Sequence, residues 1–599
     1  MLWGLSASVL VGMTGLTIDF TRAQVIRTQI QNAADGAALV AARNASTMSL
    51  SDRTALARAY FDAEAGEYGQ GAEFSLTPLD DNTYKVNVDV SMPGSLTKLI
   101  SAHDWNIGVE SEAVHGGTNI EVALVLDTTG SMSGSKISDL RGAATDFVNT
   151  VVNDVQTPFY SKVALVPFSA GVNVGSYSDT AHGTVPGGKT ITGASWSTGT
   201  AMTVTAITKA NPAVVTTSAA HGFTSGNTVY LSGISGMTQV NNHYYTVTPV
   251  SGQPTKFQLN GVNSSSYSTF STSGSPRATK CQTSACEVVV TANSHGFSNG
   301  AYVYITGVNG MTQINNATGN GSSATSWLVA GATTNSFVLS GSTGPSYSAY
   351  TNSGSVYCTT LGCNYYRFTN ASNTVNVWPI NASCVSDRVG GHANDAASPS
   401  TALVGYNYPV PGNGDTNSRC PTTSIVPLTA TKSTLTSAIS TLTASSYTGG
   451  QIGTAWGWYM ISPDWNTVWT GTSAPAAYNA PQTAKVAVIM TDGTYNLMYC
   501  NGVMSKDAGS GSSTNHANCN APNGDGTAQA QAICTAMKAK GIIIYTVGFD
   551  MSGEPQSSTT MLTQCATSPS YFYNADDGTA LHQAFASIAT SISQLRISH

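Results

Sequence analysis

The stretch from Val122 to Met132 reads Val-Ala-Leu-Val-Leu-Asp-Thr-Thr-Gly-Ser-Met, and it decides the expected fold. Its first five residues are an unbroken apolar run, as in a strand buried on both faces of a sheet. The following turn therefore lies at the carboxyl end of a strand, where open α/β sheets bind ligands. Asp127, Thr129 and Ser131 alternate along this turn and are expected to share one side. One carboxylate and two hydroxyls, without His or Cys, form a donor set for Mg²⁺ rather than zinc.

Helix and strand patterns alternate on both sides of a long interruption. A helical pattern from about Lys136 precedes an apolar run at 163–168, and after residue 425 further helical patterns surround a buried strand that ends at Asp492. This alternation predicts an α/β fold with a doubly wound, mostly parallel sheet. Because the carboxyl ends of parallel strands share an edge, we expect Asp492 beside Asp127. Thr448, in a loop that precedes a helix, is expected to complete the metal site.

The interruption is rich in Gly, Ser, Thr and Asn and contains an internal repeat. The motif His221-Gly-Phe and the residues after it recur from His295-Gly-Phe in the same order and spacing, which predicts two tandem β modules. We expect both His residues to be turn structure rather than ligands, since no other ligand type is beside them. The predicted division is a membrane helix at 1–20, a small α+β domain at 21–116, an α/β domain in two parts at 117–175 and 426–599, and an all-β insertion at 176–425 with repeats at about 212–275 and 286–356.

Composition and cysteine usage indicate an oxidising compartment. Only 9% of the 599 residues are charged, the net charge is −7, and no basic stripe is present, so nucleic acid is not an expected partner. All ten cysteines follow residue 280, and an even count in a turn-rich chain suggests disulfides. Free buried thiols are the alternative, and the spacing does not favour zinc. The predicted pairs are Cys281–Cys286, Cys358–Cys363, Cys384–Cys420, Cys500–Cys519 and Cys534–Cys565.

The amino terminus is apolar from Leu2 to Ile18, at the short end of the 17 to 25 residues that span a bilayer. A signal peptide and a plain buried helix are the alternatives. Arg22 and Arg27 follow the run and no basic residue precedes it, which alone would place the following side in the cytoplasm. The cysteines indicate the opposite. Because Met1 directly abuts the run, we expect a basic leader to be absent from this version of the chain, and the body to lie outside the cytoplasm.

These residues resemble two known families. Asp127-x-Thr129-x-Ser131, the loop Thr448 and Thr491-Asp492-Gly493 resemble the metal-ion-dependent adhesion site of von Willebrand factor type A domains, with Thr129 where the family usually has Ser. Thr448 lies five residues before Gly453, as the family's loop threonine does before its glycine, so it is preferred to Thr454. The amino-terminal segment, including Gly15 to Asp19 and Gln31 to Leu39, resembles TadE/TadG-like tight-adherence (Flp-type) pilus assembly proteins, as do several motifs up to the Leu595-Arg-Ile ending.

The two resemblances imply a bacterial envelope protein with a pilin-like α+β domain, anchored in the inner membrane through its amino-terminal helix, with a periplasmic or surface-exposed body. Its metal site would hold Mg²⁺, with Mn²⁺ or Ca²⁺ as alternatives, and would bind a carboxylate of a pilus or envelope protein. A second hypothesis is a structural scaffold in which the metal only stabilises the fold. A third is a hydrolase carried by the insertion, but the sequence has no nucleophile elbow and no phosphate loop, so an enzyme is not expected.

Overall fold

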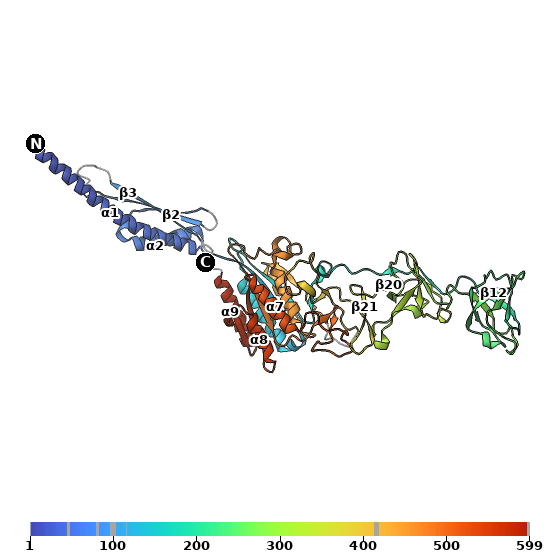
Figure 1. Cartoon of the computed structure of the whole chain (residues 1–599). Coiled ribbons are helices and arrows are strands. Elements are labelled where there is room, and N and C mark those ends of the chain that lie inside the picture. The colour runs from blue at the N-terminus through green and yellow to red at the C-terminus, as the bar shows by residue number, and fades with distance from the viewer. Residues whose placement is uncertain are drawn as a thin grey trace.

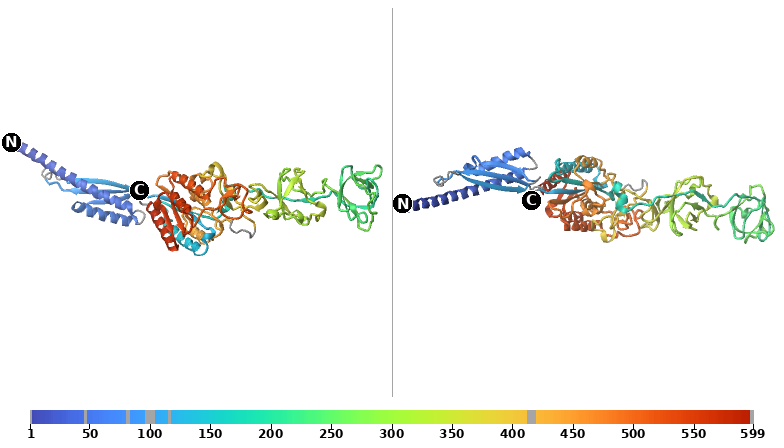
Figure 2. Two further views of the ribbon diagram at one scale, coloured as in Figure 1. Left: turned by 60° about the horizontal axis from the view of Figure 1, so that its bottom comes forward. Right: turned by 90° about the horizontal axis from the view of Figure 1, so that it is seen from above.

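The chain forms an elongated molecule in which three bodies follow one another (Figure 1). The computed structural model describes residues 2–44, 48–79, 83–95, 104–114, 117–411 and 419–595. A small α+β domain lies at the end with the N terminus, an α/β domain lies in the middle, and β modules extend from it to the far end (Figures 1 and 2). Met1 and the Arg596-Ile597 ending of the predicted motifs lie outside the described residues.

The amino-terminal domain packs two helices against a three-stranded antiparallel sheet. The elements are α1 (Leu2–Arg43), α2 (Leu50–Ala65), β1 (Glu73–Pro78), β2 (Thr83–Met92) and β3 (Trp105–Val114). One apolar side of α1 is buried, including Ile26, Ile30 and Ala33, and its small alanines allow α1 to lie close to the sheet. Among the described helices, none is both long and apolar enough to cross a membrane. The bilayer span at 1–20 therefore stays a prediction.

The middle body is built on a nine-stranded sheet in the order β24-β23-β6-β5-β4-β26-β29-β30, with β25 (Val426–Thr429) also paired to β5. Its parallel centre is a contiguous set of five strands, and antiparallel strands extend the β5 edge. The parallel strands are β4 (Asn119–Asp127), β5 (Ser161–Phe168), β26 (Thr483–Thr491), β29 (Ile543–Phe549) and β30 (Phe572–Ala575). The edge strands are β6 (Val172–Asn173), β23 (Cys384–Ser386) and β24 (Gly405–Tyr406). The predicted α/β fold is thus present, but its sheet is mixed rather than mostly parallel, because the pairings β5–β6, β6–β23, β23–β24 and β5–β25 are antiparallel.

Helices cover both faces of this sheet. One face buries its side chains with α3 (Ser135–Val151), α5 (Lys432–Ser440) and α9 (Gly578–Leu595), and the other with α6 (Gly450–Ile461), α7 (Gly526–Ala539) and α8 (Gln556–Cys565). Side chains of β4 alternate between the two cores, with Val122 and Leu124 on one side and Val125 on the other. Gly457 lets α6 approach this strand, because a Cβ there would lie 2.5 Å from Val125.

The two β modules of the insertion are nested rather than simply consecutive. The first copy is a closed six-stranded barrel spanning 202–280, and the second is a seven-stranded sheet whose strands lie at 189–195 and 289–358. The first copy therefore interrupts the second between its first strands and the rest, and it forms the far end of the molecule (Figure 1). The barrel strands are β9 (Met202–Ile207), β10 (Val214–Thr217), β11 (Thr228–Ser232), β12 (His243–Pro249), β13 (Lys256–Leu259) and β14 (Arg277–Lys280).

The second module and the return path complete the insertion. The second module contains β7 (Lys189–Thr190), β8 (Gly193–Ser195), β15 (Val289–Thr291), β16 (Tyr302–Thr306), β18 (Trp327–Ala330), β19 (Ser336–Ser340) and β20 (Ser355–Cys358). A three-stranded sheet of β17 (Gly319–Asn320), β21 (Tyr365–Thr369) and β22 (Val375–Pro379) then leads back to β23. The short elements α4 (Ser178–His182), β27 (Tyr499–Cys500) and β28 (Val503–Met504) lie in the loops of the α/β domain.

The repeated histidines make the same bonds in both copies. His221 Nδ1 accepts a hydrogen bond from the backbone N–H of Phe223 (2.9 Å), and His295 Nδ1 accepts one from Phe297 (2.9 Å). The opposite ring nitrogen donates to a backbone carbonyl in each case, that of Lys256 or Ser336. Both rings are thus satisfied within their own turns, in agreement with the prediction that they are turn structure.

Five disulfides are present, and they are the five predicted pairs. They join Cys281–Cys286, Cys358–Cys363, Cys384–Cys420, Cys500–Cys519 and Cys534–Cys565. The first lies where the chain leaves the barrel for the second module, and the third ties the return path of the insertion to the segment before β25. The last joins α7 to α8, as the sequence predicts.

A buried ion pair joins the two central strands of the α/β sheet. Glu121 on β4 and Lys485 on β26 are adjacent in the parallel register, and their side chains are 0% and 3% exposed. Lys485 Nζ donates to Glu121 Oε2 (2.5 Å) and to the carbonyl of Ile461 (2.9 Å). The other carboxylate oxygen accepts from the Tyr160 hydroxyl. A slip of one residue between the strands would separate two buried charges, so the pair strengthens this register.

We predict that Lys485→Met lowers the free energy of unfolding of the α/β domain by about 3–5 kcal/mol, because it leaves Glu121 buried without a counter-ion. Adding Glu121→Gln should recover most of that loss. Denaturant unfolding followed by tryptophan fluorescence measures both. Lys432→Met, which breaks the exposed pair with Asp154, is the matched control and should cost less than about 1 kcal/mol. Equal costs for the two lysines would contradict the prediction.

Candidate metal centre

The turn after β4 gathers three of the predicted ligands on one side. Asp127 ends the strand, and its Oδ1 accepts a hydrogen bond from the backbone N–H of Thr129 (2.8 Å). The hydroxyls of Thr129 and Ser131 are 3.0 Å apart. Asp127 and Thr129 are buried, whereas Ser131 is exposed. The side-chain oxygens of the turn therefore run from the buried end of β4, at Asp127, to the protein surface, at Ser131.

Asp492 joins this turn from the neighbouring strand. It directly follows β26, and its Oδ1 accepts a hydrogen bond from the Ser131 hydroxyl (2.6 Å). Thr491, the last residue of β26, donates its hydroxyl to Asp127 Oδ2 (2.6 Å). The parallel register of β4 and β26 thus brings the carboxylates of Asp127 and Asp492 close to the hydroxyls of Thr129 and Ser131, at one edge of the sheet as predicted. Thr491 and Asp127 meet there although 364 residues separate them in the sequence.

The loop that carries Thr448 packs against the same turn through its backbone. Gly130 N–H donates to the carbonyl of Ser446 (2.8 Å), and Ser445 N–H donates to that of Thr128 (2.8 Å). Thr448 itself is buried, and Asn496 accepts from its N–H and donates to its carbonyl. In the described part of the chain, no hydrogen bond joins the Thr448 hydroxyl to the other four predicted ligands. The alternative, Thr454, lies inside α6 and donates its hydroxyl to the carbonyl of Gly450 (2.9 Å).

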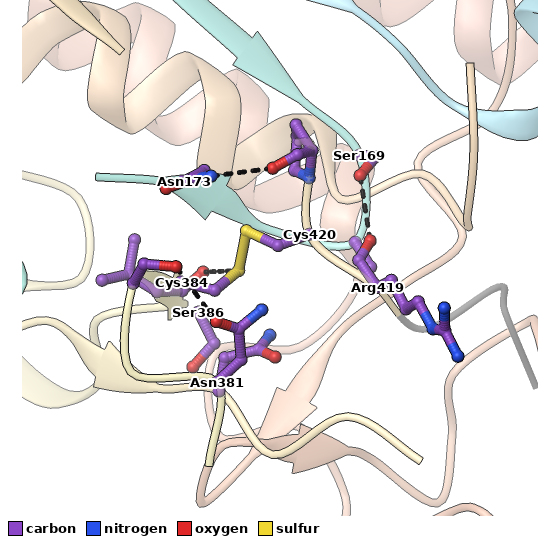
Figure 3. Close-up of a disulfide and its surroundings, with 12 residues drawn as sticks. Ser169, Asn173, Asn381, Cys384, Ser386, Arg419 and Cys420 are labelled. Carbon is purple, nitrogen blue, oxygen red and sulfur yellow. Dashed lines mark hydrogen bonds between the residues drawn. A yellow bond between two sulfur atoms is a disulfide. The ribbon is translucent and has the colours of Figure 1, made fainter. Parts of the chain in front are cut away.

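The disulfide Cys384–Cys420 lies at the end of the insertion's return path, in the same region as Ser169 and Asn173 (Figure 3). The Ser169 hydroxyl, just beyond β5, donates to the carbonyl of Arg419 (3.1 Å), and the Ser169 carbonyl accepts from Gly449 N–H (2.8 Å). Asn173 on β6 donates to the carbonyl of Pro421 (3.0 Å). Arg419, next to the disulfide, and the Thr448 loop therefore share one anchor, Ser169, at the end of β5.

The two carboxylates of the site are buried and close to each other. Burial, and after it the charge of Asp492, raise the pKa of Asp127 to about 7. Burial also raises the pKa of Asp492, although hydrogen bonds from Ser131 and Lys136 oppose the shift. Lys136 Nζ lies 3.2 Å from Asp492 Oδ2 and 3.0 Å from Asp550 Oδ2. Two buried carboxyl groups with one partly exposed ammonium beside them favour the binding of a further cation.

The residues of the site fit a hard divalent cation. Asp127, Thr129, Ser131, Thr448 and Asp492 offer only oxygen, and Mg²⁺ takes carboxylate and hydroxyl oxygens while it retains some water. Mn²⁺ and Ca²⁺ accept the same donors. Within the described ranges, no group of three or more His, Cys, Asp or Glu side chains converges in a way that could hold a metal. The candidate site thus depends on hydroxyls as well as on its two carboxylates.

Three neighbours of the site did not emerge from the sequence as site residues. Thr491 holds Asp127 in place, Asn496 holds the backbone of Thr448, and Lys136 contacts Asp492. Thr491 could have been found because it directly precedes Asp492 on a buried strand. Lys136 and Asn496 carry no such signal, because nothing in the local pattern shows which distant loop they meet.

We predict a pH-dependent stability in metal-free protein. An aspartate in an unfolded chain has a pKa near 3.9, so between about pH 4 and 7 the folded protein retains a proton on Asp127 that the unfolded chain has released. The free energy of unfolding therefore falls as the pH rises through this range and then levels off. Denaturant unfolding in chelator at pH 5 and pH 7.5 should show a smaller decrease for Asp127→Asn than for the wild type.

The matched control is Asp154→Asn, whose side chain is 88% exposed and which lies just beyond the C-terminal end of α3. It should retain the wild-type pH dependence. Identical pH dependence of the wild type and Asp127→Asn would show that Asp127 does not titrate in this range.

Comparison with protein families gives two matches. Residues 1–44 match the family described as putative Flp pilus-assembly TadE/G-like. Residues 210–280, which cover most of the barrel, match the ubiquitin-activating enzyme E1 FCCH domain. No curated protein matches the sequence. The resemblance to TadE/TadG-like proteins is thus confirmed for the amino-terminal segment.

Solved structures with similarity include two bacterial pilus proteins. The pilus adhesin SpaC from Lactobacillus rhamnosus GG, in an open conformation, is 10% identical, with 87% of this chain and 34% of that chain covered and a TM-score of 0.27. The chain therefore spans about a third of the length of SpaC. The vWF domain of the type V pili tip protein Mfa5 from Porphyromonas gingivalis is 9% identical, with 80% and 96% covered and a TM-score of 0.27.

Proposed function

We propose that the protein is a pilus-associated envelope protein that binds protein partners through a metal-ion-dependent adhesion site in a von Willebrand factor type A domain. The single observation that carries the proposal is the meeting of Asp127, Thr129 and Ser131 with Asp492 at the carboxyl ends of two adjacent parallel strands. Ligand sites of open α/β sheets lie at this edge. The TadE/G-like match at 1–44 supports the pilus context.

The metal would be Mg²⁺, held by Asp127, Thr129, Ser131, Thr448 and Asp492. Bound there, it would offer a partner's carboxylate a positive centre. Ser131 is the exposed member of the set, so this end of the site is where a partner would approach. The partner would be a pilus or envelope protein, and the amino-terminal helix would anchor the chain in the inner membrane with its body outside the cytoplasm. A non-enzymatic role agrees with this arrangement.

A structural scaffold is the second candidate, and the location of the site between two central strands favours it. Asp127 and Asp492 are buried at the adjacent ends of β4 and β26. A cation that neutralises both carboxylates would therefore stabilise the domain whether or not a partner binds. In that case the metal would contribute to folding alone.

We predict that Asp127→Asn weakens Mg²⁺ binding by more than about tenfold, because it removes one of two ligand charges. Isothermal titration of chelator-treated full-length protein with MgCl₂ measures this change. The adhesion proposal further requires that Asp127→Asn loses partners that the wild type retains from envelope extract in Mg²⁺ and releases in chelator. Asp154→Asn is again the matched control.

The two candidates give opposite results in this experiment. Loss of partner binding together with the Mg²⁺-dependent part of the stability supports adhesion, because the variant loses the bound cation in either case. Loss of Mg²⁺-dependent stability with unchanged partner binding supports the scaffold. If wild-type protein shows no heat of Mg²⁺ binding and no thermal shift with Mg²⁺, both versions of the metal proposal are wrong.

A further inference from the structure

We propose that Lys136 is a positioning residue of the candidate metal centre: its ammonium group neutralises Asp492 in metal-free protein, and Mg²⁺ displaces it onto Asp550. This inference rests on the proposed metal function. It adds that the Lys136 ammonium group and Mg²⁺ occupy the Asp492 carboxylate in turn. Lys136 is the second residue of α3, which begins directly after the metal-binding turn.

Both oxygens of Asp492 are engaged by donors. Ser131 donates to Oδ1 (2.6 Å) and Lys136 donates to Oδ2 (3.2 Å). The Asp492 side chain is 0% exposed, so an uncompensated charge there would be costly. Lys136 supplies the compensating charge. A divalent cation that takes up Asp492 supplies the same compensation, and it repels the ammonium group beside it.

Asp550 gives the displaced lysine a second partner. It follows β29, the strand next to β26, and its Oδ2 lies 3.0 Å from Lys136 Nζ. Ser552 donates to the other oxygen, Oδ1 (2.9 Å), so one carboxylate oxygen is fixed and the other faces the lysine. The hydrogen bond from Lys136 holds the pKa of Asp550 below its usual value, which keeps this carboxylate charged.

The lysine is therefore shared between one buried carboxylate and one that is 39% exposed. Moving it fully to Asp550 breaks a single hydrogen bond and leaves its charge paired. The ring of Phe549, with its centroid 5.8 Å from Lys136 Nζ, lies beside both arrangements. Mg²⁺ binding thus competes with Lys136 for Asp492, while Asp550 lowers the cost of that competition.

The test is the Mg²⁺ affinity of three variants, measured with MgCl₂ alone at constant ionic strength. Lys136→Gln should bind Mg²⁺ about 3- to 10-fold more tightly than the wild type, because it removes the competing charge. Asp550→Asn should bind about threefold more weakly, because Lys136 then has only Asp492 as its acceptor. The double variant should behave like Lys136→Gln, since Asp550 acts through the lysine.

A second measurement compares the melting temperature in chelator with that in Mg²⁺. In chelator, Lys136→Gln should melt about 2–4 °C below the wild type, because Asp492 loses its counter-ion, and Mg²⁺ should remove that difference. A merely structural role of Lys136 could lower stability, but it would not raise Mg²⁺ affinity. Lys432→Gln, at the opposite end of the domain in its exposed pair with Asp154, is the matched control and should change neither quantity.

The outcomes separate this inference from the proposed function. If the wild type binds Mg²⁺ but Lys136→Gln binds it equally well or more weakly, the exchange is wrong and the metal site stands. If the effects of Lys136→Gln and Asp550→Asn simply add in the double variant, Asp550 acts as a distant charge and the exchange is again wrong. If the wild type binds no Mg²⁺, the proposed function fails, and this inference fails with it.

Discussion

The parallel pairing of β4 with β26 is the constraint on which the rest of the α/β domain depends. Glu121 and Lys485 meet near one end of the two strands, and Asp127 and Thr491 meet at the other, in both cases across 364 residues of sequence. One register therefore satisfies a buried ion pair and assembles the candidate metal centre. Since side chains alternate between the two faces, a shift by one residue would misplace both sets at once. The pairing of β4 with β26 thus determines both the buried ion pair and the geometry of the candidate metal centre.

The insertion is compatible with this pairing because of where it leaves the sheet. It departs after β6 and returns through β23, and these two short strands pair with each other at the edge of the sheet. The ends of the insertion are thus adjacent, and loop closure depends only weakly on length: a sixfold longer flexible loop costs only about 1.6 kcal/mol more. The barrel is inserted into the second module in the same way, between β8 and β15, which pair with each other. Each inserted body begins and ends at neighbouring strands, so the β modules of the insertion extend away from the α/β domain (Figure 2) without disturbing its sheet.

Much of this fold could be predicted, and the exceptions have physical reasons. Buried strands such as Val122–Leu126 are recognisable because a short apolar run that ends in a polar turn is typical of a strand in the centre of a sheet. The repeat was visible too, but its nesting was not, because similarity of sequence does not reveal that the first strands of the second module, at 189–195, precede the first module. Within the site, Asp127 and Asp492 follow from the rule for strand ends. Lys136 and Asp550 do not, since an isolated charge in a sequence carries no information about its neighbours in space.

Thr448 shows how the insertion and the candidate site share a boundary. Its loop is anchored at Ser169, whose hydroxyl also donates to Arg419 at the end of the insertion's return path. The disulfide Cys384–Cys420 keeps that path against β6 (Figure 3). Beyond it, the Thr422 hydroxyl lies 3.0 Å from the Thr443 hydroxyl, just before the same loop. The base of the insertion and the backbone that borders the turn after β4 are therefore linked by hydrogen bonds at Ser169 and Thr443. Because Ser169 bonds both to Arg419 and to Gly449, the position of the Thr448 loop depends on how the insertion is seated on β5 and β6 as well as on the helix that follows the loop.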